Sequence, residues 1–135
     1  MIDKLVRTYM YPSTSIHING GNKKMLRLHD HNFKCEMELT VYLISGKWKI
    51  PIIWNLKEGT MRFAEIKRQL GSVTPKMLTQ QLRELEEANL VKRLIYAEMP
   101  PRVEYSLTED AISILPILKQ LSQWGNNYYN KNKTN

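Results

Sequence analysis

One segment of the chain, residues 63–108, carries the pattern that most limits the possible fold. A helical run over residues 63–70 is followed by a short turn containing Gly71 and then by a longer amphipathic run that starts at Thr74. Two strand-like runs with alternating apolar residues come next, at 91–98 and 102–108. A helix, a tight turn, a helix and a basic hairpin follow one another in this order in a winged helix-turn-helix. The pattern therefore predicts a mainly α domain with a small β-hairpin.

The second helix of this pattern has two distinct faces. Leu78, Leu82 and Leu85 repeat at spacings of four and three residues, which places them on one face, toward a core. Thr74 fits the N-cap position and Pro75 fits the first helical position. The other face has side-chain types that bind base edges in a major groove, namely Lys76, Thr79, Gln80 and Arg83. A solvated helix face often has the same composition, but the capped turn before it and the hairpin after it favour DNA recognition.

Basic residues elsewhere extend this candidate interface. Lys92, Arg93 and Arg102 flank the predicted hairpin, and Arg102 is next to its tip. In a wing such residues contact phosphates or the minor groove, whereas on an edge strand the same charges only prevent aggregation. Lys47 and Lys49 stand at the start of another predicted helix, where they either contact phosphate or solvate the helix.

Three further helices are expected. One begins near Cys35 and is interrupted at Ser45-Gly46, and the next, residues 47–56, is apolar nearly all round and should be buried. The last is capped by Thr108 and runs to about Asn127, with apolar residues over more than one stripe. A terminal helix this apolar needs more cover than one small core provides, so a partner chain is expected.

Composition and length limit the class of protein. The net charge of +7 favours an anionic partner, double-stranded DNA before an anionic membrane. No run approaches the ~20 apolar residues of a membrane span, and a single cysteine fits a cytoplasmic chain without a disulfide framework. We expect a poorly specified arm at 1–33, the winged domain with terminal dimerisation helices at 34–128, and a polar tail at 129–135.

An enzyme is not expected. The chain has no recognisable nucleophile–base–acid set, no glycine-rich phosphate loop and no cysteine pair with metal-ligand spacing. The segment His29-Asp30-His31 has metal-ligand types but too few further ligands, so it is interpreted as a coincidental cluster. No cofactor and no metal are therefore predicted.

Cys35 is the one residue with possible redox chemistry. It stands between Lys34 and Glu36 at a predicted helix N-terminus. The helix dipole and the lysine favour the reactive thiolate, whereas Glu36 opposes it. The alternative is an inert, small apolar side chain.

Several stretches together resemble a known family: residues 46–49, 62–66, 76–85 and 96–108, and Leu121 with Trp124-Gly125. Over about residues 35–128 the chain is similar to the HxlR-type bacterial winged-helix transcriptional regulators, which are relatives of the MarR type. The resemblance implies a homodimer on a palindromic operator, near genes for electrophile, aldehyde or oxidant responses. The alternative function is a winged-helix module for protein–protein contacts that binds no operator.

The resemblance also implies roles for particular residues. The first and last helices would form the dimer interface, with candidate residues Leu39, Leu43, Ile114, Leu118, Leu121 and Trp124. Cys35 matches the cysteine that some members use to sense quinones, hypochlorite or other electrophiles. A proline often follows that cysteine in the family, and here the following residue is Glu36.

Overall fold

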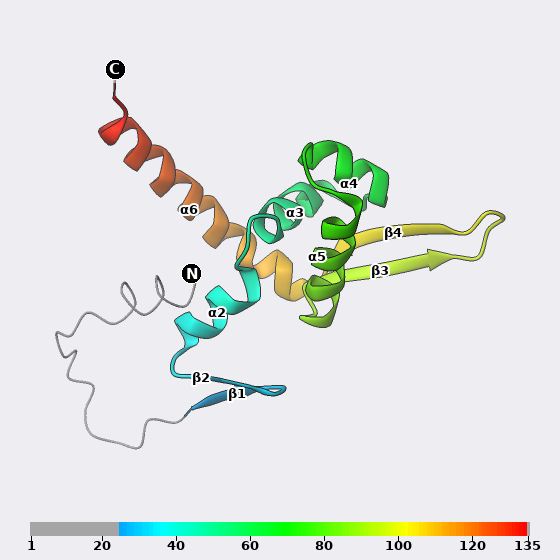
Figure 1. The fold of residues 1–135 in the computed structure, drawn as a ribbon, viewed down its shortest axis with the longest axis horizontal. Coiled ribbons are helices and arrows are strands. Elements are labelled where there is room, and N and C mark those ends of the chain that lie inside the picture. The colour runs from blue at the N-terminus through cyan, green and yellow to red at the C-terminus, as the bar shows by residue number, and fades with distance from the viewer. Residues whose placement is uncertain (1–24, 135) are drawn as a thin grey trace. The chain divides into compact units, whose positions relative to one another are not determined.

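The computed structural model describes residues 25–134, which fall into two compact units with a boundary after Glu36 (Figure 1). The first described element pair is an antiparallel hairpin of β1, Leu26–Leu28, and β2, His31–Phe33. His29 adopts a φ of 51° in its turn, and the Arg27 Nε donates to the His29 carbonyl oxygen at 3.4 Å. Regular strands were not expected within the arm at 1–33. Strands this short have too few residues for alternation to stand out in the sequence. Residues 1–24 of that arm lie outside the described part of the chain.

The second unit contains the predicted helix-turn-helix and wing. Its elements, in chain order, are α2 (Glu36–Ile44, which begins at the boundary), α3 (Lys49–Asn55), the 3₁₀ turn η1 (Leu56–Glu58), α4 (Phe63–Leu70), α5 (Pro75–Glu87), β3 (Val91–Tyr96), β4 (Arg102–Leu107) and α6 (Glu109–Asn132). Strands β3 and β4 pair antiparallel, from Val91 opposite Leu107 to Tyr96 opposite Arg102. The backbone of Met61 adds a short bridge to Tyr105 on the other edge of β4. The mainly α winged helix-turn-helix fold is thus confirmed.

Helix α3 contributes Ile52 and Ile53 to the core, but it is not buried nearly all round as its apolar composition predicted, because Ile50 and Trp54 are only partly buried. Ile52 and Ile53 are fully buried, and the surrounding α4, α5 and β3 contribute further fully buried side chains: Ile66, Leu78, Leu82, Leu85 and Val91. The buried leucines of α5 are those of the predicted apolar face. Its start is also as expected, since the Thr74 Oγ1 accepts from the Met77 backbone N–H at 3.1 Å and Pro75 takes the first helical position.

The last helix is longer than the sequence indicated. We expected α6 to end near Asn127 and a polar tail at 129–135, but the helix continues to Asn132. No proline follows Tyr128 to stop the helix. The polar side chains that we expected in the tail instead make hydrogen bonds to residues one helical turn earlier. The Asn132 Nδ2 donates to the Tyr128 carbonyl oxygen at 2.8 Å, and the rings of Trp124 and Tyr128 stack at 5.4 Å. In Figure 1 this C-terminal half of α6 runs out beyond the other helices of its unit.

Candidate DNA interface

The second helix of the motif, α5, separates a buried face from an exposed face. Leu78, Leu82 and Leu85 are at most 2% exposed. The side chains predicted to read bases are all exposed on the other side of the helix: Lys76, Thr79, Gln80 and Arg83. The Thr79 hydroxyl donates to the Pro75 carbonyl oxygen at 2.8 Å, so its polar group is already engaged by the helix itself. The other three have longer side chains, with polar groups of the types that pair with base edges in a major groove.

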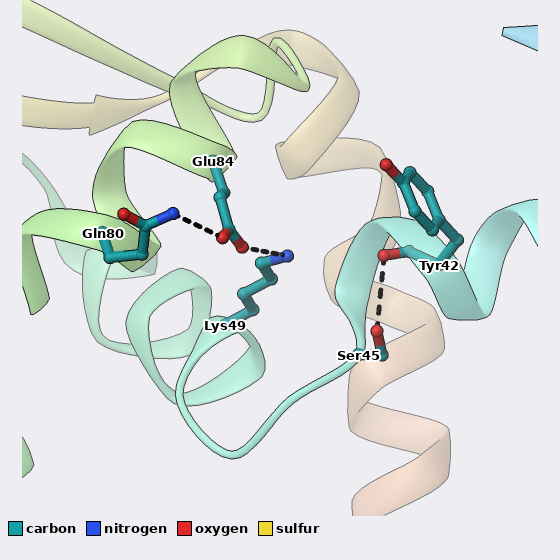
Figure 2. A network of polar contacts seen from close by, with 5 residues as sticks. All are labelled: Tyr42, Ser45, Lys49, Gln80 and Glu84. Carbon is teal, nitrogen blue, oxygen red and sulfur yellow. Dashed lines mark hydrogen bonds and ion pairs between the residues drawn. The ribbon is translucent and has the colours of Figure 1, made fainter. Parts of the chain in front are cut away.

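Glu84, one turn after Gln80, joins this face to the core helix (Figure 2). The Lys49 Nζ lies 2.8 Å from the Glu84 Oε2, and the Gln80 Nε2 donates to the Glu84 Oε1 at 2.9 Å. The hydrogen bond from Lys49, followed by that from Gln80, lowers the pKa of Glu84 below its ordinary value of 4.5, although partial burial opposes this shift. The carboxylate is therefore ionised at neutral pH.

Lys49 does not have the environment we expected for a phosphate contact. Its side chain is only 13% exposed, and its ammonium group is paired with a carboxylate of the same chain. No local pattern in the sequence indicates this pair, because the two residues are 35 positions apart. Lys47, by contrast, is exposed, with its ammonium group 4.7 Å from the centre of the Trp48 ring. In the same region the Ser45 hydroxyl donates to the Tyr42 carbonyl oxygen at 3.4 Å, at the end of α2 (Figure 2).

The wing carries two kinds of basic residue. Lys92 and Arg93 are exposed on β3. Arg102, which we expected to present its charge near the tip, instead lies over the Tyr96 ring, 4.3 Å from its centre. Its Nη2 is 3.4 Å from Glu98, and its Nε is 3.4 Å from Glu104 as an ion pair without hydrogen-bond geometry. The guanidinium therefore joins both strands of the wing near its tip.

Comparison with known proteins agrees with this geometry. The family model of the HxlR-like helix-turn-helix matches residues 43–133. The chain belongs to the HxlR-like helix-turn-helix family. It is 48% identical over 99 residues to an uncharacterised HTH-type transcriptional regulator of Methanothermobacter thermautotrophicus, covering 73% of this chain and 76% of that protein.

Two solved structures of regulators are also similar to it. A putative HTH-type transcriptional regulator, ytcD, has a TM-score of 0.69 and 45% identity, covering 71% of this chain and 98% of that one. The redox regulator HypR in its oxidised form has a TM-score of 0.65 and 44% identity, covering 69% of this chain and 96% of that one. The protein is thus a transcriptional regulator with a helix-turn-helix fold, and its relatives are named as regulators rather than enzymes. Membership of the family implies DNA binding.

Helix α6 of this HxlR-like regulator exposes an apolar stripe. Ile117, Leu121, Trp124 and Tyr128 follow one another at spacings of four, three and four residues, and each is more than half exposed. These spacings place them on one face of the helix.

Some residues that we expected at a dimer interface pack instead against the core of their own chain. Leu118 is only 4% exposed and belongs to the chain's own core, and Ile114 packs against that core. Both lie on the inner side of α6, which sequence periodicity could not separate from the outer side because apolar residues cover both. In α2, Leu43 also packs against the core, whereas Leu39 is half-buried.

A groove that the sequence analysis missed lies between α3 and α6. It has a volume of about 480 Å³ and is mostly apolar, with Asn55 and Ser122 as the polar lining residues beside Ile50, Pro51, Trp54, Leu118 and Leu121. The available signal was the apolar cover of α3 nearly all round, because one core cannot bury every side of a helix; Ile50 and Trp54 are the large residues left only partly buried. Leu121 belongs both to this groove and to the exposed stripe.

Cys35 is half-buried and immediately precedes α2. His29 and His31 lie at the turn of the β1–β2 hairpin, and between residues 25 and 134 no three His, Cys, Asp or Glu side chains gather closely enough to hold a metal ion. None of the helices in that same range has the length and apolar character that crossing a membrane requires.

Proposed function

We propose that this regulator binds DNA sequence-specifically, as a homodimer on a palindromic operator. The observation that supports this most directly is the division of α5 into a buried leucine face and an exposed face with Lys76, Gln80 and Arg83. A helix of this kind enters the major groove and reads base edges there. The acidic residues Glu86 and Glu87 lie toward the C-terminal end of α5, where they would be repelled by phosphates. The N-terminal half of the helix is therefore the end that we assign to the groove.

Basic residues around α5 would supply the contacts to the DNA backbone. Lys92 and Arg93 on the wing and Lys47 before α3 are exposed, so they are our candidates for phosphate contacts. Arg102 is already paired with Glu98 and Glu104, and we assign it the role of stabilising the wing. Lys49 is assigned to the ion pair with Glu84.

The homodimer would form through the exposed stripe of α6, residues Ile117, Leu121, Trp124 and Tyr128. Large apolar side chains that follow one helix face and remain more than half exposed are typical of a protein–protein interface. In a symmetric dimer the same stripe on both chains would be buried. The two α5 helices would then address half-sites about one turn of DNA apart, roughly 34 Å.

Salt dependence separates this proposal from a winged-helix module that contacts only proteins. A duplex chosen by in vitro selection from a randomised library would be titrated with the protein at increasing salt. Because basic residues release counterions from DNA, the affinity should fall steeply with salt, and it should exceed that for a scrambled duplex. Failure to prefer any sequence in the library would contradict operator binding.

We further propose that Cys35 makes the regulator responsive to oxidants or electrophiles. The similarity of the chain to a redox regulator, HypR, supports this proposal. Cys35 is the only cysteine of the sequence, so a disulfide would have to join two chains or include a small thiol. Hypochlorite could accept the two electrons that two thiols release when they form the disulfide. The test compares operator affinity before and after hypochlorite or a quinone in the wild type and in Cys35→Ser. A loss of affinity only in the wild type is expected, and an equal response of both proteins would exclude Cys35 as the sensor.

A further inference from the structure

We propose that Glu84 is a positioning residue for sequence recognition: Lys49 holds its carboxylate, and the carboxylate orients the amide of Gln80 toward a base edge. The inference rests on the proposed function, since it states how α5 would read DNA. It adds an acidic residue, and a lysine outside the recognition helix, to the residues that determine specificity.

The carboxylate of Glu84 is held through both of its oxygen atoms. Oε2 is 2.8 Å from the Lys49 Nζ, and Oε1 accepts from the Gln80 Nε2 at 2.9 Å (Figure 2). A glutamine–glutamate pair one turn apart on an exposed helix is weak by itself, because both side chains are mobile. Lys49 changes this situation. It is the first residue of α3, whose Ile52 and Ile53 are fully buried, and its own side chain is only 13% exposed.

The chemistry of the two groups decides which way the amide faces. An ionised carboxylate only accepts hydrogen bonds, so the NH₂ group of Gln80, rather than its oxygen, must face Glu84. The lowered pKa of Glu84 keeps this acceptor ionised at neutral pH. One N–H of Gln80 is then committed to Glu84, and its second N–H and its oxygen remain for DNA. A donor and an acceptor side by side match N7 and N6 of adenine.

The same ion pair reduces an electrostatic cost. Glu84 stands next to Arg83 and one turn after Gln80, close to the face that we assign to DNA. An unpaired carboxylate there would repel the phosphate backbone. Lys49 supplies the opposite charge from within the protein, so the acid can orient Gln80 without an uncompensated charge at the interface.

The test compares base preferences rather than affinities alone. The duplex selected by the wild-type protein would be varied one base pair at a time through a half-site, and each duplex would be titrated with the wild type, Gln80→Ala, Glu84→Ala and the double variant. Gln80→Ala should identify the position that Gln80 reads, with a loss of preference of roughly 5- to 150-fold. Glu84→Ala should lose preference at the same position, and the double variant should lose no more than Gln80→Ala.

Glu87→Ala is the matched control, because it removes the same charge from an exposed site on the same helix. It should leave the pattern of base preference unchanged. Glu84→Gln has one acceptor oxygen instead of two and an NH₂ group in place of the other, so it cannot accept from both Lys49 and Gln80 and should reduce the preference at the Gln80 position as well. Lys49→Met removes the anchor from α3 and should reduce the preference at the Gln80 position, which tests the same link should Glu84→Ala fold poorly.

The outcomes distinguish this inference from the proposed function. If Glu84→Ala and Lys49→Met change the affinity for every duplex by one common factor and keep the pattern of preference, the positioning role is wrong and operator binding still stands. If the wild type prefers no sequence at all, the proposed function itself has failed.

Discussion

At the scale of single residues, contacts to bases and contacts to phosphates should differ in how they respond to truncation. Arg83 is exposed on the base-reading face of α5, and Lys92 is exposed on the wing. We expect Arg83→Ala to lower the affinity for the selected duplex by ~1–3 kcal/mol while changing the affinity for a scrambled duplex much less, because the guanidinium reads a base edge. Lys92→Ala should weaken binding to both duplexes alike. It should also reduce the slope of log affinity against log salt concentration by about 1. Titrations of both duplexes at several salt concentrations measure this, and equal effects of Arg83→Ala on both would assign Arg83 to the backbone.

At the scale of the elements, the start of α5 offers a test of the cap that positions the recognition helix. The Thr74 Oγ1 accepts from the Met77 backbone N–H, and Thr74 is exposed, so its replacement leaves no cavity. Thr74→Ala should lower the free energy of unfolding by ~1 kcal/mol, since one backbone N–H at the helix start loses its acceptor. Chemical denaturation measures this change. Thr74→Ser is the control, because it keeps the hydroxyl and should remain close to the wild type; an equal loss in both variants would point to the methyl group instead.

The elements that the sequence predicted well are those specified by neighbouring residues. The face of Leu78, Leu82 and Leu85 and the caps Thr74 and Thr108 depend on spacings within one or two turns, and the structure confirms them. The pairing of Lys49 with Glu84 could not be predicted in this way, because it depends on how α3 packs against α5. The same holds for Arg102, whose pairing with Glu98 and Glu104 requires the hairpin to form first. Charge type alone indicated phosphate contacts for both basic residues.

At the scale of the whole molecule, the exposed stripe of α6 should determine whether the protein is a dimer. Leu121 is 52% exposed and lies in the middle of the stripe, between Ile117 and Trp124. We expect Leu121→Asp to convert the dimer into a monomer at micromolar concentration, because it would place a charge in a buried apolar interface. The side chain is half exposed in the monomer, so the fold should be retained, as circular dichroism would show. Sedimentation velocity measures the change in assembly.

Ile112 provides the matched control for this prediction. It is on the same helix and similarly exposed, at 54%, but it precedes Leu121 by nine positions, half a turn out of phase in a helix of 3.6 residues per turn. Ile112→Asp should therefore stay dimeric and keep its operator affinity. Leu121→Asp should lose most of its affinity for a palindrome while keeping its weak binding to a single half-site, because each α5 is intact and only the linkage between the two is lost. A Leu121→Asp protein that remains dimeric, or a monomer that binds the palindrome as tightly as the wild type, would show that the two recognition helices are not joined through α6.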